Sequence, residues 1–236
     1  MASTDWTELT GSISAAALAR GVTSGITVPN GGGSFTYGFN SIASGVTGMA
    51  GSFYSFDATF NPTAANKGGR ITGAMKRMPS ASNTDYAPFL FILAQGPNAT
   101  DNSYMLGLQD DDPSHIVLVK GQMSAGLPAG DVGTSGILRK SAAAISVDTW
   151  IHLRIDAVVQ GTGDVIITMK QNDLTTNTVT APVWTDIDGM APFTDDALGI
   201  NSGSVPYTSG RFGFGMYSAN VSRRAAFDQI TIARQV

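Results

Sequence analysis

The 236-residue sequence contains no cysteine, which excludes disulfides, thiolate metal sites and a cysteine nucleophile. Histidine is almost as scarce, because the chain has only His115 and His152. A zinc site would therefore have to draw on carboxylate ligands. The sequence also lacks a G-x-S-x-G segment and a G-x-x-x-x-G-K-[ST] loop, so neither a nucleophile elbow nor a phosphate cradle is indicated. We expect no cofactor.

Charged residues make up only 14% of the chain, against roughly 25% in an average protein. The formal charge is −4 and no basic stripe stands out, so nucleic acid is not an expected partner. No apolar run approaches the ~20 residues that span a bilayer, so we expect no membrane contact. The N-terminal stretch MASTDWTELTGS lacks the basic and then apolar pattern of a signal peptide. We therefore expect a soluble chain that stays in the cytoplasm where it is made, unless it leaves by a route other than secretion.

Glutamate is nearly absent, because Glu8 is the single glutamate among 18 acidic residues. Glutamate favours exposed helices whereas aspartate favours turns, so this composition predicts strands and loops. Glycoside hydrolysis usually needs two carboxylates on either side of the scissile bond, and a pair of glutamates is excluded. A pair of aspartates stays open, but Asp156 has no second carboxylate on its face of the strand at 149–159. A glycan hydrolase or lyase is therefore the least favoured function.

What the sequence does contain is a strong period of two. In TWIHLRIDAVV, residues 149–159, every second residue from Ile151 to Val159 is apolar, and Trp150, His152, Arg154 and Asp156 alternate with them. Such alternation predicts a strand with one buried face. The turn GTGD and the apolar stretch that follows it complete a predicted hairpin. The stretch APFLFILAQ is apolar throughout, which is typical of a strand buried on both faces.

Further strands bring the total to about a dozen at the spacing of a β-sandwich. One exception is SISAAALARG at 12–21, which could form two or three helical turns. No linker or repeat interrupts the chain, so we expect one all-β domain over 1–236, with 1–34 as a candidate arm for assembly contacts. The further predicted strands are 22–28, 34–42, 50–60, 69–77, 102–109, 115–122, 136–140, 179–186, 210–218 and 225–235.

The densest group of oxygen ligands is Asp110, Asp111 and Asp112, in the stretch LGLQDDDPSHIVLVKG. Calcium prefers such ligands, but consecutive aspartates in a tight turn point in different directions. The flanking SYMLGLQ and HIVLVKG both resemble strands, and Asp-Asp-Asp-Pro-Ser supplies turn chemistry. The favoured interpretation is an acidic hairpin tip. A calcium ion, or a basic residue of a partner at that tip, remains the alternative.

A glycan site would need aromatic rings on a polar sheet face, together with hydrogen-bonding side chains. Trp150, Trp184, Tyr104 and Tyr207 are the candidate stacking rings, and each could equally be an ordinary packing residue. His152 and Arg154 alternate with Trp150 along one predicted strand and could supply hydrogen bonds. We consider these six residues as low-specificity candidates for a site that contacts glycans.

The C-terminal stretch GRFGFGMYSANVSRRAAFDQITIARQV resembles the closing strands of concanavalin A-like, or laminin G-like, jelly-roll sandwiches. TWIHLRIDAVV and SYMLGLQDDDPSHIVLVKG resemble two earlier strands of that family, so the likeness covers about 102–236. It implies two large antiparallel sheets packed face to face, one of them concave. Members include lectins, glucanases, receptor modules and parts of virus particles, and the paired glutamates of the glucanases are missing here.

The stretch from Trp6 to Ser41 resembles, as a whole, small structural proteins of tailed bacteriophages. This resemblance implies a non-enzymatic protein of the virion, made in the bacterial host cytoplasm. It would be bound to the head as decoration or cement, or attached to the tail. Its partners would then be other capsid or tail proteins, or further copies of itself. The alternative is a lectin-like carbohydrate-binding module that contacts glycans on the host surface.

Overall fold

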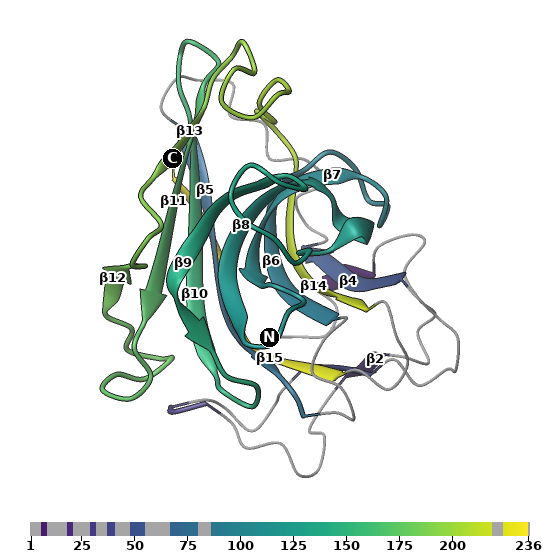
Figure 1. Cartoon of the computed structure of the whole chain (residues 1–236), viewed down its shortest axis with the longest axis vertical. Helices are drawn as coiled ribbons and strands as arrows, with labels where there is room; N and C mark the ends of the chain where they lie inside the picture. Colours follow the sequence, from purple (N-terminus) through teal and green to yellow (C-terminus); the bar gives the residue numbers. More distant parts are fainter. Residues whose placement is uncertain are drawn as a thin grey trace.

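Two antiparallel β-sheets packed face to face make up the described part of the molecule (Figure 1). The computed structural model describes residues 6–8, 18–20, 29–31, 37–40, 48–54, 67–79, 86–218 and 224–235. In this part of the chain the only helical element is one 3-10 turn, η3 (Met123–Ala125). The fold class predicted from the sequence, an all-β jelly-roll sandwich, is confirmed.

The strands pair far along the chain as well as with their neighbours in sequence. The seven-stranded sheet has the order β1 (Trp6–Glu8), β4 (Gly48–Tyr54), β14 (Arg211–Ser218), β6 (Tyr86–Ala94), β7 (Asn102–Leu108), β8 (Ser114–Gln122) and β9 (Ile137–Ile145). The eight-stranded sheet has the order β12 (Trp184–Asp186), β11 (Val165–Asn172), β10 (Ile151–Val159), β5 (Lys67–Arg77), β15 (Arg224–Gln235), β3 (Tyr37–Asn40) and β2 (Leu18–Arg20), with β13 (Phe193–Asp195) also paired to β11.

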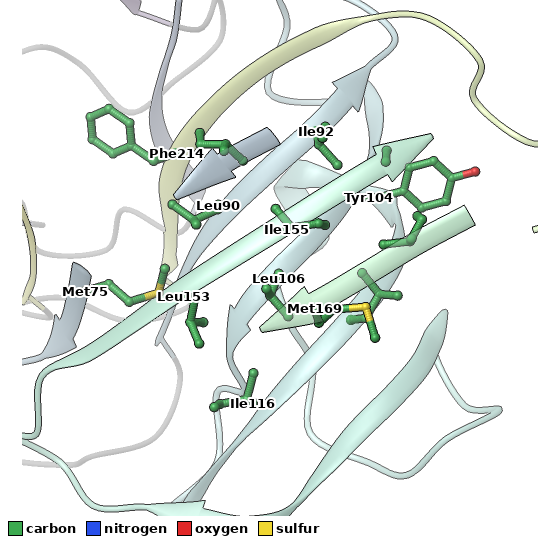
Figure 2. Close-up of a cluster of buried hydrophobic side chains, with 14 of the residues drawn as sticks. Met75, Leu90, Ile92, Tyr104, Leu106, Ile116, Leu153, Ile155, Met169 and Phe214 are labelled. Atoms are coloured by element: carbon green, nitrogen blue, oxygen red, sulfur yellow. The ribbon is translucent and has the colours of Figure 1, made fainter. Parts of the chain in front are cut away.

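The main hydrophobic core fills the space between the two sheets. Leu153 and Ile155 of β10 point into it, as the alternating pattern predicts, and meet Leu90 of β6 and Leu106 of β7 (Figure 2). Because every second residue of β10 enters this core, the residues between them must face away from it. That geometry sets the outer face of the eight-stranded sheet.

A second apolar cluster covers the other face of the seven-stranded sheet. Phe89 and Phe91 of β6 project into it, so β6 is buried on both faces, as predicted. Met123 and Leu127, from η3 and the loop after it, pack against these rings. Gly126 allows this close approach, because a Cβ there would lie 2.5 Å from the side chain of Tyr217 and its φ is +66°. The chain therefore covers this face of the sheet with its own residues.

Most predicted strands are confirmed, with shifted ends. The stretch at 69–77 is β5, those at 102–109 and 115–122 are β7 and β8, and those at 210–218 and 225–235 are β14 and β15. The described parts of the predictions at 34–42 and 50–60 belong to β3 and β4, and β9 continues five residues beyond the predicted 136–140, to Ile145. The predicted strand at 22–28 lies outside the described residues.

Two local predictions are corrected by the strand pairing. Residues 18–20, within the predicted helix at 12–21, form β2 because they pair with β3, and the rest of that helix lies outside the described residues. Only 184–186 of the predicted strand at 179–186 is extended, as β12. The ladder to β3 overrides the local helical preference of 18–20, whereas residues 179–183 pair with none of the described strands.

Candidate functional site

Four of the six glycan candidates belong to the outer face of the eight-stranded sheet. Directly paired residues of neighbouring antiparallel strands lie on the same side of a sheet. The register pairs Trp184 with Asn172 and Asn172 with His152, which forms one row of side chains across β12, β11 and β10. Arg154, two residues along β10, begins the next row on the same face. Trp150 precedes β10 and continues this alternation beyond His152.

His152 packs against the indole of Trp184, and Asn172 holds His152 in place. The amide Nδ2 of Asn172 donates to Nδ1 of His152 over 3.2 Å, while its Oδ1 accepts from the backbone N–H of Val183 over 3.0 Å. Because the amide group faces it, Nδ1 is an acceptor, and the neutral ring carries its proton on Nε2. The rings of His152 and Trp184 are tilted, with centroids 4.7 Å apart.

Burial determines what His152 can do. His152 is only 2% exposed, and this burial lowers the pKa of its imidazole to about 4. The ring is therefore neutral near pH 7. The prediction that His152 itself contacts a glycan is corrected, because so little of the residue reaches the surface. Its role is to position Trp184, which is half-buried.

Beyond Trp184, two arginines share one aspartate. Nε of Arg70 lies 2.5 Å from Oδ1 of Asp156, and Nε of Arg154 lies 2.6 Å from Oδ2. The guanidinium carbon of Arg154 is also 6.0 Å from the ring centroid of Trp184. We call Arg70, Asp156 and Arg154 the arginine triad. The triad continues the surface from Trp184 across to β5.

The surroundings of Asp156 do not favour hydrolysis of a glycosidic bond. Its cross-strand partners on this face are Arg70 and Thr168, and its neighbours along β10 are Arg154 and Val158. None of these four residues carries a carboxylate. Within the described residues, Asp156 thus lacks the adjacent acid that a two-carboxylate mechanism requires.

Trp150 is partly covered by a lysine. Nζ of Lys76 lies 5.5 Å from the centroid of the indole and forms an ion pair with Asp148 over 2.7 Å. The stem of Lys76 is buried, whereas Asp148 is exposed. Trp150 therefore lies at one end of the face and presents less of its ring than a free stacking platform would.

Tyr104 and Tyr207, the other two candidates, lie together in a different place. Tyr104 is 0% exposed and belongs to the core between the sheets, so its predicted role as a glycan-stacking ring is corrected. Its hydroxyl donates to Oδ2 of Asp195 and accepts from the backbone N–H of Tyr207 over 3.1 Å. Burial and the bond to Asp195 both raise the pKa of Tyr104. The two rings pack with centroids 5.1 Å apart, and Tyr207 is half-buried.

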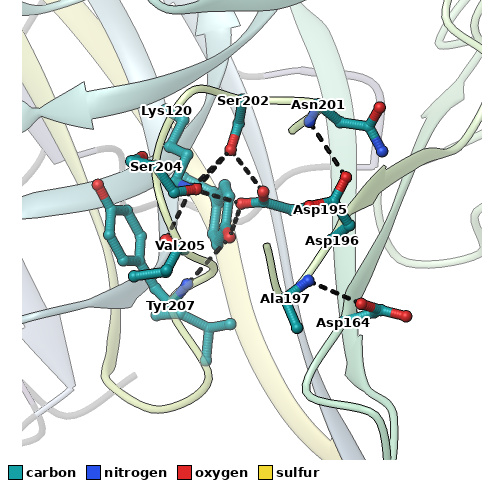
Figure 3. Close-up of polar contacts among 12 residues, drawn as sticks. Lys120, Asp164, Asp195, Asp196, Ala197, Asn201, Ser202, Ser204, Val205 and Tyr207 are labelled. Atoms are coloured by element: carbon teal, nitrogen blue, oxygen red, sulfur yellow. Dashed lines mark hydrogen bonds and ion pairs between the residues drawn. The ribbon is translucent and has the colours of Figure 1, made fainter. Parts of the chain in front are cut away.

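Both rings lie beside the ammonium group of Lys120, which forms a buried ion pair with Asp195 that the sequence pattern did not indicate (Figure 3). Nζ of Lys120 lies 2.7 Å from Oδ2 of Asp195, with side-chain exposures of 3% and 0%. The ammonium group also donates to the carbonyls of Ser204 and Val205 over 2.6 and 2.8 Å. Because β8 and β13 belong to different sheets, this pair joins the sheets and fixes the loop after β13. One signal was available, since Lys120 follows Ile116 and Leu118 on the inward face of β8.

The three consecutive aspartates form the tip of the hairpin between β7 and β8, as predicted. Leu108 pairs with Ile116, and the backbone N–H of Gln109 donates to the carbonyl of His115 over 2.9 Å. Asp111 and Asp112 are exposed, while Asp110 is half-buried. Across the part of the chain that the structure describes, no group of three His, Cys, Asp or Glu side chains lies close enough to hold a metal ion.

An arginine of the same chain holds this tip. Arg77 of β5 is 1% exposed, and its Nη1 donates to the carbonyls of Gln109 and Asp111 and to Oγ of Ser114. Its guanidinium carbon also lies 4.4 Å from the ring centroid of Tyr86. Burial lowers the pKa of Arg77, against the raising effect of nearby Tyr86 and of the tip aspartates. The acidic tip thus has a basic partner within the molecule.

Solved structures with the same arrangement of sheets identify the fold. An alginate lyase of polysaccharide lyase family 7, AlgAT5, matches with a TM-score of 0.53 and 11% identity over 99% of this chain and 95% of that chain. The alginate lyase from Corynebacterium sp. matches with a TM-score of 0.52 and 10% identity over 98% and 95%. The exoplasmic/lumenal domain of VIP36, in a Ca2+/Man3GlcNAc-bound form, matches with a TM-score of 0.50 and 10% identity over 98% and 84%.

The fold is a concanavalin A-like jelly roll. No family model and no curated protein matches the chain. At 10 to 11% identity the likeness establishes the fold, and the same fold serves lyases and glycan-binding domains alike. None of the helices among the described residues is long and apolar enough to cross a membrane.

The jelly roll presents two faces with different chemistry. The outer face of the seven-stranded sheet is filled by Met123, Leu127 and the rings beneath them. The outer face of the eight-stranded sheet instead carries Trp184 and the arginine triad. Of the two sheet faces, the second therefore has the chemistry to bind a polar ligand. Arg70, which the sequence analysis did not single out, belongs to it only through the register of β5 with β10.

Proposed function

We propose that this chain is a non-catalytic, carbohydrate-binding jelly roll whose binding surface is the outer face of the eight-stranded sheet. The observation that carries the proposal is the half-buried indole of Trp184, fixed between His152 and Arg154 at the edge of a polar sheet face. A fixed aromatic ring beside hydrogen-bond donors is the arrangement that stacks against sugar rings. Because its supporting side chains are already ordered, little conformational entropy is lost on binding.

The chemistry of the same face supports binding over catalysis. Asp156 is bonded to two arginines and has no neighbouring carboxylate on its four sides. Nδ1 of His152 already accepts from Asn172, and the ring is deeply buried. Neither group is arranged to donate or remove a proton on a bound sugar. The alginate lyases with this fold keep an enzymatic role as the competing proposal, and the glycan-bound VIP36 domain supports the binding one.

The test of this proposal is the substitution Trp184→Ala. Removing a stacking ring should weaken binding to a responsive glycan by about tenfold or more, because apolar contact area and ring geometry are both lost. Binding can be measured on glycan arrays and on bacterial cell envelopes. Leu198→Ala is the control, since it removes an exposed apolar side chain that is not part of the row formed by Trp184, Asn172 and His152. Flat binding curves for the wild-type chain at high protein concentration, or equal binding by both variants, would refute the proposal.

A second candidate is a structural role in a tailed-phage particle, on the head or the tail. The specific observation that favours it is an exposed apolar group in one loop, formed by Leu198, Ile200 and Val205. Lys120 fixes this loop by donating to the carbonyls of Ser204 and Val205. Rigid, exposed apolar side chains are typical of protein contact sites. A glycan-binding protein carried on a virion would combine both functions.

Incorporation into particles tests the second candidate. Mass spectrometry of gradient-purified virions should detect the protein in fixed stoichiometry. Ile200→Ser should lower its incorporation, whereas Val183→Ser, another exposed apolar residue, should not. Virions that lack the protein would rule this function out and leave the carbohydrate-binding proposal untouched.

A further inference from the structure

The arginine triad has more hydrogen-bond donors than its one carboxylate can occupy. Each guanidinium carries five N–H groups, and a carboxylate has two oxygens. Arg70 uses Nε on Asp156, and Arg154 uses Nε and Nη2. Among the described residues, Nη1 and Nη2 of Arg70 and Nη1 of Arg154 have no hydrogen-bond partner. The side chain of Arg70 is 30% exposed, so its free edge can be reached from solvent.

The triad also carries an excess of positive charge. Two guanidinium groups face one carboxylate, which leaves a net charge of about +1. The adjacent pair on this face, Lys170 and Asp186, is neutral overall. The whole chain carries −4, so the triad is opposite in sign to the net charge of the protein. Because Asp156 holds both arginines in place, their free N–H groups are ordered before any ligand arrives.

Stacking and anion recognition lie on one continuous strip. Trp184 contacts Arg154, and Arg154 shares Asp156 with Arg70. Trp184 and Arg70 are three strands and two rows apart in the register. With ~4.8 Å between strands and ~3.3 Å per residue, this corresponds to about 20 Å. A single sugar cannot span that distance, whereas an extended chain of sugars can.

We infer that this strip binds an extended saccharide that carries carboxylate or sulfate groups. One sugar ring stacks on Trp184, and an anionic group further along the chain accepts from the free Nη groups of Arg70 and Arg154. A guanidinium edge and a carboxylate or sulfate match in geometry as well as in charge. The inference rests on the proposed carbohydrate-binding function and specifies its ligand class.

The experiment compares two oligomers that differ only in charge. Isothermal titration of the whole chain uses oligogalacturonate and the fully methyl-esterified oligomer of the same length, and a heparin-derived oligosaccharide provides the sulfate arm. Arg70→Gln removes the free guanidinium edge, and Arg154 still pairs with Asp156 through two bonds. Lys140→Gln is the matched control, because it removes one positive charge from an ion pair on the other sheet.

The expected result is binding of an anionic oligomer that weakens about tenfold in Arg70→Gln, because a hydrogen bond to a charged group is lost. The esterified oligomer should bind more weakly, high salt should reduce anionic binding, and Lys140→Gln should match the wild type. Binding of the heparin fragment alone supports the inference and assigns sulfate as the anion.

Two results would overturn the inference. Equal affinity for both galacturonate oligomers, unchanged in Arg70→Gln, would show that the triad does not recognise the negative charge of the ligand. If Trp184→Ala still abolished that binding, the carbohydrate-binding function would stand without the inference. Failure of the anionic oligomers to bind at all, with a neutral glycan bound on the array, would also reject the anionic ligand and keep the proposed function. Failure of every glycan would reject both.

Discussion

Lys120 carries its charge into the space between two sheets, where only 3% of its side chain is exposed. Removing such a charge from water is costly, and the cost is offset only if every donor finds an acceptor. Lys120 meets this condition through Asp195 and the backbone carbonyls of Ser204 and Val205. Asp195 in turn accepts from Tyr104 and Ser202. The stability of this region therefore depends on every hydrogen bond to Lys120 and Asp195 being made.

Lys120→Met should lower the free energy of unfolding by about 3–5 kcal/mol, because it leaves Asp195 buried without its cation. Urea denaturation measures the loss. Lys140→Met removes a lysine whose partner, Asp131, is exposed, and should cost only a small fraction of that amount. Equal losses in the two variants would show that burial does not distinguish the pairs.

His152 makes folding sensitive to acid. Burial lowers its pKa from 6.5 to about 4, so the unfolded chain binds this proton first as the pH falls. The contribution of His152 to stability is complete above about pH 6.5 and is lost as the pH falls towards 4, in total about 3 kcal/mol. His152→Gln should therefore show a shallower loss of stability than the wild type between these pH values, as measured by urea denaturation. Parallel curves would contradict the assignment.

At the scale of single elements, the β7–β8 hairpin shows how a polar turn is held. Arg77 reaches from β5 to bond the carbonyls of Gln109 and Asp111, so the grip is on the backbone of the tip. The identity of the three aspartate side chains matters much less to this contact. Asp111 is used locally, because its Oδ1 accepts from the N–H of Asp112 over 2.9 Å, and an asparagine oxygen can accept the same bond.

The combined variant Asp110→Asn, Asp111→Asn and Asp112→Asn should change the unfolding free energy by less than about 1 kcal/mol. Arg77→Met should cost about 2–4 kcal/mol, because it removes the buried donor to the carbonyl of Asp111 and to Oγ of Ser114. Thermal unfolding with and without calcium measures both effects. A large loss in the triple variant, or stabilisation of the wild type by calcium, would instead reveal an ion site at the tip.

Local pattern predicted the elements whose own residues decide their structure. The alternation of β10 and the continuous apolar run of β6 are visible in the sequence because each strand's faces are set within it. The inward orientation of Tyr104 could also have been predicted, because Leu106 and Leu108 lie on the same face of the strand. Lys120 and Asp195 are 75 positions apart, and Arg70 reaches Asp156 only through the pairing of β5 with β10. No local pattern contains such partners.

At the scale of the whole molecule, the two apolar clusters are joined through the strands they share. Leu90 and Phe91 are adjacent in β6, yet one enters the core between the sheets and the other the cluster beneath η3. Loss of either cluster must therefore disturb the same strand. We therefore propose that the chain unfolds as one domain, as the absence of linkers predicts.

Calorimetry should show one unfolding transition with equal calorimetric and van't Hoff enthalpies. Ile155→Val, in the first cluster, and Phe91→Leu, in the second, should each lower the midpoint of that same transition, because both remove packing from a shared sheet. Two separate transitions, each shifted by one variant only, would divide the chain into independent units.

The position of β5 has a consequence for the timing of synthesis. It lies between β10 and β15, so its last neighbour is the final strand that the structure describes. About 150 residues separate β5 from β15, which a ribosome adds in roughly 8 to 30 s. During that interval β5 has an open edge that another nascent chain could occupy. We therefore expect the yield of folded protein in the cell to depend on the rate of translation relative to the rate at which nascent chains associate. Chaperones that shield the edge of β5 should raise this yield.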